Sequence, residues 1–191
     1  MLGALRQAQI PLTTLRNHQW GKVATPMGRD PAGKTLGILG MGSIGRNMAA
    51  KARAFGMKIQ YHNRSRLSPE LEQGAEYVDF DTLLSTSDVF SLNLALNDKT
   101  RHIIGKEELG KMKKGVTIVN TARGALIDEA ALAEALDDGE RIWSAGLDVF
   151  EEEPKVHPGL MANPRVFLLP HIGTATTETR VSVTDPDPPV V

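Results

Sequence analysis

Three glycines within residues 40–45 have the spacing with which a backbone loop binds the pyrophosphate of a dinucleotide. The segment reads GMGSIG and follows an apolar run, so it matches G-x-G-x-x-G between a strand and a helix. The first glycine permits a tight turn, the second lets the backbone approach the anion, and the third lets the helix pack closely on the strand. The helix N-terminus adds free N–H groups and a positive dipole end. The motif predicts that the cofactor is bound by Gly40, Gly42, Ser43, Ile44 and Gly45. Another nucleotide-like ligand, or a purely structural turn, is the alternative.

A second group of polar residues follows the next predicted strand, where proteins that bind NAD usually carry an acid. This segment, residues 61–66, reads YHNRSR and contains no carboxylate. Arg64 and Arg66 are suited to hold a 2′-phosphate through paired hydrogen bonds, helped by Asn63 and Ser65. We therefore expect NADP as the preferred cofactor and NAD as the second choice. The alternative is a solvated basic loop.

The elements that must position these residues alternate between short apolar strands and helices. Strands are predicted at residues 35–40, 58–61, 89–94, 116–120, 142–148 and 166–169. Helices are predicted at residues 43–55, 80–87, 106–112 and 128–136, with a short helical turn that begins at residues 68–69. Asp128 and Gly139 carry the start and stop signals of the last of these helices. Alternation at this spacing indicates βαβ units, so the predicted fold class is α/β, with a Rossmann-type doubly wound parallel sheet.

The two ends of the chain depart from this alternation. Residues 1–20 have a loose helical pattern that Pro11 interrupts, which predicts a kinked helix or two short ones, and a turn-rich link follows. Residues 185–189 read DPDPP, which suits neither a helix nor a strand ladder. We therefore divide the chain into three parts. They are an N-terminal helical arm and linker (1–33), an NAD(P)-binding Rossmann domain (34–172) and a C-terminal tail (173–191) that is disordered at its end.

The composition excludes several classes of function. Apolar residues make up 41% and charged residues 24%, an ordinary balance for a soluble globular domain, and the net charge of −1 favours neither nucleic acid nor an anionic membrane as partner. No cysteine is present, which excludes disulfides, thiolate metal sites and a cysteine nucleophile. The histidines show no metal-ligand spacing, so no metal site is predicted. No apolar run approaches the roughly 20 residues that span a bilayer. We expect a cytoplasmic protein.

Four motifs in a fixed order resemble the D-isomer-specific 2-hydroxyacid dehydrogenases. They are the glycine loop and residues 119–128 (VNTARGALID), 146–154 (GLDVFEEEP) and 169–176 (LPHIGTAT). The resemblance runs from residue 12 to residue 179, and residues 61–64 make the chain most similar to the glyoxylate and hydroxypyruvate reductases of that family. It implies an NAD(P)-dependent oxidoreductase acting on the CH–OH group of 2-hydroxy acids, which reduces glyoxylate, hydroxypyruvate or a similar 2-oxo acid.

The resemblance also assigns roles to residues whose types alone leave them ambiguous. It implies that Arg123 holds the substrate carboxylate and keto oxygen, that His171 donates the proton in reduction, and that Glu153 favours the imidazolium form of His171. It places Asp148 near the nicotinamide carboxamide. The other residues expected to contact the cofactor are Leu94, Thr100, Thr121, Ala122, Arg123 and His171. Histidine suits a proton shuttle and a guanidinium suits a 2-oxo acid, so the residue types agree with these roles. Without the resemblance, the same residues would be interpreted as a surface arginine, a loop histidine and a solvated acid.

The family is built from two domains, and this sequence departs from that pattern. Neither the N-terminal part of the substrate domain nor its C-terminal helix is visible, so we expect the substrate domain to be missing and the chain to be a fragment or a shortened gene product. In the family the N-terminal helical region helps to form a dimer, so we expect a homodimer or poor solubility. The expected partner is a small 2-oxo or 2-hydroxy acid.

Two other functions compete with the reductase. One is a truncated, catalytically weak or inactive dinucleotide-binding or scaffold domain, because the fold alone does not decide function. The other is an S-adenosylmethionine methyltransferase, which shares the glycine loop. A methyltransferase has no use for Arg123, Glu153 and His171, so it is disfavoured.

Overall fold

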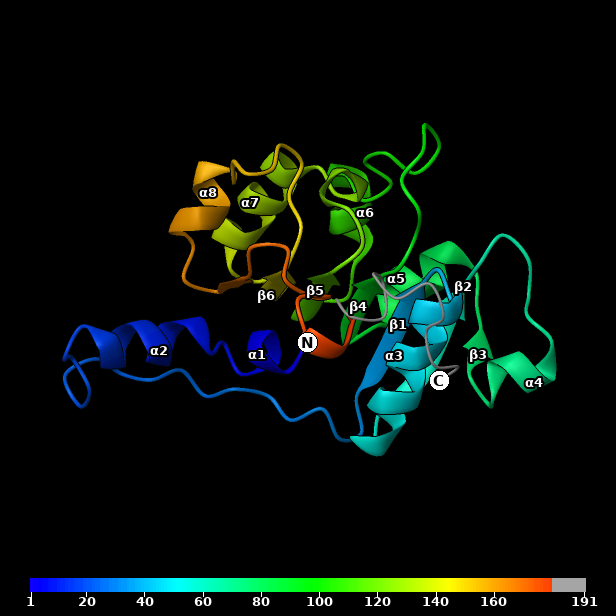
Figure 1. Ribbon diagram of the computed structural model, residues 1–191, viewed down its shortest axis with the longest axis horizontal. Coiled ribbons are helices and arrows are strands. Elements are labelled where there is room, and N and C mark those ends of the chain that lie inside the picture. Colours follow the sequence, from blue (N-terminus) through cyan, green and yellow to red (C-terminus); the bar gives the residue numbers. More distant parts are fainter. Residues whose placement is uncertain (180–191) are drawn as a thin grey trace.

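A seven-stranded parallel sheet forms the centre of the computed structural model, which describes residues 1–179 (Figure 1). The strand order is β3-β2-β1-β4-β5-β6-β7, and every neighbouring pair is parallel. The strands are β1 (Thr35–Leu39), β2 (Lys58–His62), β3 (Glu76–Tyr77), β4 (Val89–Leu92), β5 (Val116–Asn120), β6 (Ile142–Leu147) and β7 (Val166–Leu168). The order reverses between β1 and β4, which is where doubly wound sheets bind their ligands. The predicted α/β class with a Rossmann-type sheet is confirmed. The end of the chain, for which we predicted disorder, lies outside the described residues.

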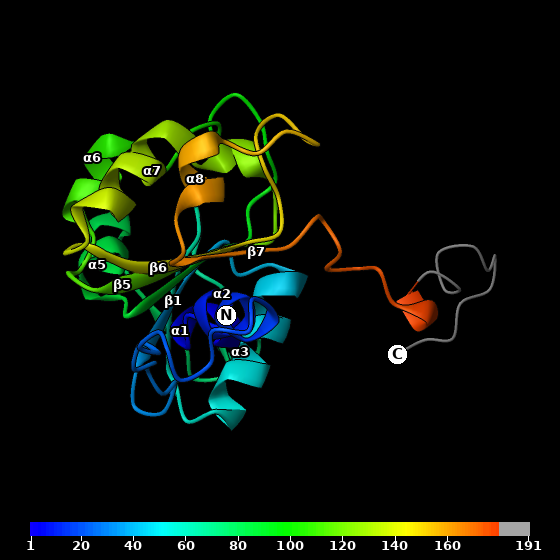
Figure 2. The same ribbon diagram turned by 90° about the vertical axis from the view of Figure 1, so that its left-hand side faces the viewer.

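Helices cover both faces of this sheet (Figure 2). The helices are α1 (Leu2–Leu5), α2 (Gln9–Arg16), α3 (Ser43–Ala54), α4 (Pro69–Glu72), α5 (Phe80–Thr86), α6 (Lys106–Lys111), α7 (Glu129–Asp138) and α8 (Pro158–Ala162), with a 3-10 turn η1 (Gly124–Leu126). The first face carries α5 to α8 and buries Phe90 and Leu132, whereas the second carries α1 to α3 and buries Ile38 and Ala49. None of the helices within residues 1–179 is long and apolar enough to cross a membrane.

The predicted strands and long helices are present, with ends shifted by two residues at most. All residues of β4 and β5 are buried, as is typical of strands covered on both faces. At the start of α7, Asp128 accepts a hydrogen bond from the Ala131 N–H, and the helix ends at Gly139, whose φ is +78°. Both of these signals are therefore confirmed. The short elements β3, η1 and α8 were not predicted, because so few residues show no periodicity.

The N-terminal segment forms two short helices, but they are not separated at Pro11. The chain turns at Gln7, whose φ is +45°. Pro11 lies in the first turn of α2, where a missing N–H costs no helical hydrogen bond. Ala4 and Leu5 of α1 are buried, and Ser144 Oγ of β6 donates to the Ala4 carbonyl oxygen at 2.8 Å. The link that follows runs back along α2 and α1 to β1 (Figure 1).

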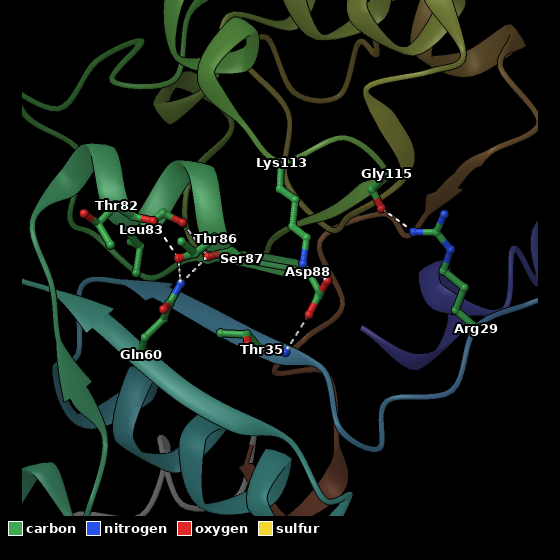
Figure 3. A network of polar contacts seen from close by, with 10 residues as sticks. All are labelled: Arg29, Thr35, Gln60, Thr82, Leu83, Thr86, Ser87, Asp88, Lys113 and Gly115. Atoms are coloured by element: carbon green, nitrogen blue, oxygen red, sulfur yellow. Dashed lines mark hydrogen bonds and ion pairs between the residues drawn. The ribbon is translucent and has the colours of Figure 1, made fainter.

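Polar side chains brace the sheet where β1 and β4 begin (Figure 3). Asp88, which precedes β4, accepts hydrogen bonds from the Thr35 N–H at 2.9 Å and from Lys113 Nζ at 2.7 Å. In β2 the buried Gln60 donates to Ser87 Oγ at 3.1 Å, so α5 is joined to the sheet. Asp88 and Thr35 stand at the amino-terminal edge of the sheet. Their contacts therefore fix the fold at the edge opposite the predicted site.

Candidate active site

Two adjoining hollows open at the carboxyl ends of the strands. One has a volume of about 870 Å³ and lies against α3 and α1, and the other has a volume of about 460 Å³ and lies between the ends of β4 and β5. Ile44, Asn93 and Thr121 line both hollows, so they meet where the strand order reverses. The predicted site residues that line one or both are Ser43, Ile44, Leu94, Thr121, Ala122 and Arg123.

The glycine loop has little room for side chains, except on one side. Gly40 has a φ of +96°, and a Cβ atom there would lie 2.8 Å from the Asn93 carbonyl oxygen. A Cβ atom on Gly45 would lie 2.5 Å from the Gly40 carbonyl oxygen, because α3 packs closely on the loop. A Cβ atom on Gly42 would meet nothing within 4 Å, and Gly42 is the N-cap of α3. The open face of the loop therefore lies at a helix N-terminus, which fits an anionic pyrophosphate.

Some of the polar side chains after β2 are hydrogen-bonded to other residues, and others are exposed to solvent. Asn63 Oδ1 accepts a hydrogen bond from the Met41 N–H at 2.7 Å, so this side chain supports the glycine loop. The guanidinium of Arg66 is paired with both carboxylate oxygens of Glu72. Arg64 and Ser65 are exposed and make no hydrogen bond or ion pair within residues 1–179. Arg64 is thus the guanidinium that remains available for a ligand.

Thr100, one of the predicted cofactor residues, organises its own loop. Its Oγ1 accepts a hydrogen bond from the Asn97 N–H and donates one to the Ala95 carbonyl oxygen, each at 2.8 Å. Thr100 lines neither of the two hollows, whereas Leu94 at the start of the same loop lines the smaller one. Within the described residues, Thr100 therefore shapes the loop that borders the site.

Arg123 stands on a turn that two unpredicted residues fix. The buried Asn120, at the end of β5, accepts from the Ala122 N–H at 3.1 Å and donates to the Arg123 carbonyl oxygen at 2.9 Å. A Cβ atom on Gly124 would lie 1.9 Å from the Phe150 carbonyl carbon, so only glycine fits. An amide at a strand end and a glycine in the following turn were the available sequence signals. The exposed Arg123 side chain lines the smaller hollow.

His171 and Glu153, far apart in sequence, are in direct contact. His171 Nδ1 lies 2.8 Å from Glu153 Oε2, and Glu153 Oε1 accepts from the Phe150 N–H at 3.0 Å. The hydrogen bond from His171, together with that from Phe150, lowers the pKa of the Glu153 carboxyl. Asp148 holds the histidine segment, because its two oxygens accept from the Ile172 and Gly173 N–H groups at 2.8 Å each. His171 itself has a φ of +52°.

A reciprocal pair of acids, also not predicted, holds the segment that carries Glu153. Glu151 Oε1 accepts from the Glu129 N–H at 2.9 Å, and Glu129 Oε1 accepts from the Glu151 N–H at 2.8 Å. Burial raises the pKa of Glu129. Glu151 Oε2 also lies 2.8 Å from His102 Nε2. These contacts fasten residues 150–153 to the start of α7.

The sequence of this chain is similar to those of known 2-hydroxyacid dehydrogenases and 2-oxo acid reductases. A family model described as the NAD binding domain of D-isomer specific 2-hydroxyacid dehydrogenases matches residues 1–173. A 4-methyl-2-oxopentanoate reductase A from Aspergillus oryzae is 68% identical over 180 residues, which are 94% of this chain and 54% of that protein. Glyoxylate reductase 1 from Saccharomyces cerevisiae is 49% identical over 185 residues, or 94% of this chain and 53% of the relative.

Solved structures agree with these sequence matches. The crystal structure of a glyoxylate reductase from Paecilomyes thermophila is 65% identical and has a TM-score of 0.93, covering 96% of this chain and 56% of that one. A D-lactate dehydrogenase from Aquifex aeolicus, complexed with NAD and lactic acid, is 28% identical with a TM-score of 0.81, covering 94% of this chain and 59% of that one. The chain thus spans about half the length of the curated relatives it matches.

Proposed function

The chain belongs to the D-isomer-specific 2-hydroxyacid dehydrogenase family, and we propose that it is the cofactor-binding part of an NAD(P)-dependent reductase of 2-oxo acids. The observation that supports this most is the 2.8 Å contact between His171 and Glu153. This pair follows the carboxyl ends of β6 and β7, at the edge of the sheet that also carries Arg123 and the glycine loop. Glyoxylate, hydroxypyruvate and 4-methyl-2-oxopentanoate are the substrates to test, since relatives are named for them.

In reduction, His171 supplies the proton. Because Nδ1 is held by Glu153, Nε2 is the ring nitrogen that donates to the substrate carbonyl oxygen as that oxygen becomes a hydroxyl. The Glu153 carboxylate stabilises the imidazolium form that this transfer requires. Arg123 binds the substrate carboxylate through paired hydrogen bonds and stabilises negative charge on the carbonyl oxygen. The nicotinamide cofactor, when bound, supplies the hydride.

The cofactor would lie along the edge where β1, β4 and β5 end. Gly40, Gly42, Ser43, Ile44 and Gly45 would hold the pyrophosphate at the start of α3. Leu94, Thr121 and Ala122 would border the nicotinamide, with Asp148 fixing the nearby histidine segment. NADP is preferred in this proposal because the exposed Arg64 is available for a 2′-phosphate and no acid follows β2 within residues 61–66.

The proposal is tested by following NADPH and NADH absorbance with the purified chain and each 2-oxo acid, and by cofactor fluorescence without substrate. We expect faster turnover with NADPH than with NADH. We also expect a loss of about 10²- to 10⁴-fold in His171→Ala, the usual contribution of a positioned proton donor. NADPH binding without turnover would instead favour a dinucleotide-binding module, and absence of binding to either cofactor would refute both.

We further infer the domain division and the oligomeric state. Residues 34–172 form the NAD(P)-binding Rossmann domain in this proposal, with 1–33 as a helical arm and linker and 173–191 as a tail. The arm exposes large apolar side chains, among them Leu15, Trp20 (81% exposed) and Met27 (86% exposed), and such a surface favours a homodimer. Sedimentation tests this, because a dimer of the wild type should become a monomer in Leu15→Asp.

A further inference from the structure

A buried acid lies beneath the exposed loop that carries Arg64. Glu72, the last residue of α4, is only 5% exposed. Its Oε1 accepts hydrogen bonds from Tyr61 Oη at 2.7 Å and from Arg66 Nε at 2.8 Å, and its Oε2 accepts one from Arg66 Nη2 at 3.1 Å. Hydrogen bonds from Arg66 and Tyr61 lower the pKa of Glu72, so the acid is charged at neutral pH.

The same network fixes the backbone at both ends of the loop. At the far end, the fully buried Tyr61 accepts a hydrogen bond from the Leu67 N–H at 2.9 Å through its Oη. At the near end, Tyr77 Oη donates to the Asn63 carbonyl oxygen at 3.1 Å, and the rings of Tyr61 and Tyr77 meet edge to face. The two tyrosines thus hold residues 63 and 67 and leave Arg64 and Ser65 exposed between them.

Glu72 carries a negative charge, as does the 2′-phosphate of the proposed cofactor, so its place near this loop needs an explanation. A carboxylate near a phosphate site disfavours the phosphate, unless the carboxylate is paired and serves the geometry of the site. Here the Nε and Nη2 groups of Arg66 are already engaged by Glu72. Arg66 is therefore committed to the loop, whereas Arg64 makes no such contact among residues 1–179.

We propose that Glu72, together with Tyr61 and Arg66, is a positioning group that sets cofactor selectivity by presenting Arg64 to the 2′-phosphate. In this arrangement Arg66 orients the loop and does not bind the phosphate, although it lies only two positions after Arg64 in the sequence. The inference rests on the proposed preference for NADP. It means that buried side chains within residues 61–72, and not only the exposed arginine, set the selectivity for NADPH over NADH.

The test compares the dissociation constants of NADPH and NADH, measured by fluorescence titration, across matched variants. Arg64→Ala is the reference, and it should weaken NADPH by about tenfold with little effect on NADH, the loss typical of a charge-assisted hydrogen bond. Glu72→Gln and Tyr61→Phe each remove one part of the network. Both should lower the selectivity for NADPH over NADH by about fivefold to tenfold, since each loosens the loop. Glu70→Gln removes the same charge from an exposed position on the same helix and is the control.

The outcomes separate positioning from simple electrostatics. If charge alone matters, Glu72→Gln raises the affinity for NADPH, as Glu70→Gln would, because an acid is lost and Arg66 is freed. That result, or unchanged selectivity in Tyr61→Phe, overturns the inference about positioning. The proposed preference for NADP still stands in that case, provided that Arg64→Ala binds NADPH more weakly than the wild type does. Unchanged selectivity in Arg64→Ala overturns both. The NADH affinity and the thermal transition of each variant report on folding, and Tyr61→Phe keeps the ion pair if Glu72→Gln does not fold.

Discussion

Glu153 and His171 form their pair in partial contact with water, with side chains 36% and 49% exposed. The hydrogen bond from His171, followed by that from the Phe150 N–H, lowers the pKa of Glu153. For an acid with a lowered pKa in the folded state, the contribution to stability is present above the ordinary value of about 4.3 and is lost as pH falls through the lowered value. Near neutral pH the carboxylate is therefore charged, and the hydrogen bond that it accepts from His171 is charge-assisted.

Replacing Glu153 by glutamine keeps a hydrogen-bond acceptor and removes the charge. We expect the rate of 2-oxo acid reduction at neutral pH to fall about 10- to 100-fold, because the His171 ring loses the charge-assisted hydrogen bond that orients it. The measurement is kcat/KM of the purified variant at neutral pH. Glu152→Gln is the matched control, since Glu152 is exposed and its side chain makes no hydrogen bond among residues 1–179. A kcat/KM of Glu153→Gln equal to that of the wild type would contradict the assigned role.

Gly124 supports the same pair through the backbone. A methyl group there would overlap the Phe150 carbonyl carbon, which lies 1.9 Å from the ideal Cβ position, and Phe150 N–H holds Glu153. We predict that Gly124→Ala lowers the free energy of unfolding by about 1–3 kcal/mol, the usual cost of overpacking, and reduces turnover as well. In contrast, Gly110 in α6 has nothing within 4 Å of its Cβ position, so Gly110→Ala should leave stability unchanged or slightly raised. Urea denaturation measures both, and equal effects would remove the steric argument.

At the scale of elements, Asp88 ties the start of β1 to the start of β4 and to the chain before β5. Burial disfavours its charged form, but the hydrogen bonds from Lys113 and the Thr35 N–H outweigh burial and lower the pKa of Asp88. The stabilisation is therefore present above the ordinary aspartate value of about 3.9 and is lost as pH falls through the lowered one. We expect Asp88→Asn to be less stable than the wild type at pH 7, and the difference to shrink below about pH 4.

Urea denaturation at several pH values tests this dependence on Asp88. The control is Asp98→Asn, because Asp98 is exposed in a loop and makes no hydrogen bond or ion pair among the described residues. A stability difference for Asp88→Asn that stays constant from pH 7 to pH 3 would show that the charge does not contribute.

Which elements the sequence predicts depends on how much local pattern each contains. The strand β5 is five consecutive buried residues, and α7 has a cap at each end, so both were predicted to within two residues. The two-residue β3 pairs with β2 through contacts that only the folded chain provides. The break between α1 and α2 was misplaced because Pro11 is a visible signal, whereas a positive φ at Gln7 has none. Local signals thus set the boundaries only where tertiary contacts agree with them.

At the scale of the whole molecule, the predicted site residues gather because parallel strands end at one edge of the sheet. Their supporting contacts were not predictable, because they join residues far apart in sequence. Glu129 and Glu151 are 22 residues apart, and Asp148 and Gly173 are 25 apart. Side-chain type indicated which residues could react, but the pairing of Tyr61 with Glu72 required the fold. The sequence therefore indicates the reactive side chains, whereas the contacts that position them depend on the folded chain.

The first helix of the N-terminal arm, α1, is part of the hydrophobic core on one face of the sheet. Leu5 is 1% exposed and packs in the same cluster as Val119, and Arg29 N–H donates to the Leu5 carbonyl oxygen at 2.9 Å. Removing a buried leucine side chain costs about 2–5 kcal/mol, so Leu5→Ala should lower the thermal midpoint of the entire chain in one transition. Leu71→Ala, at a position 42% exposed in α4, should change it little. If Leu5→Ala instead leaves the main transition unchanged and adds a separate early one, residues 1–33 unfold independently of the Rossmann domain.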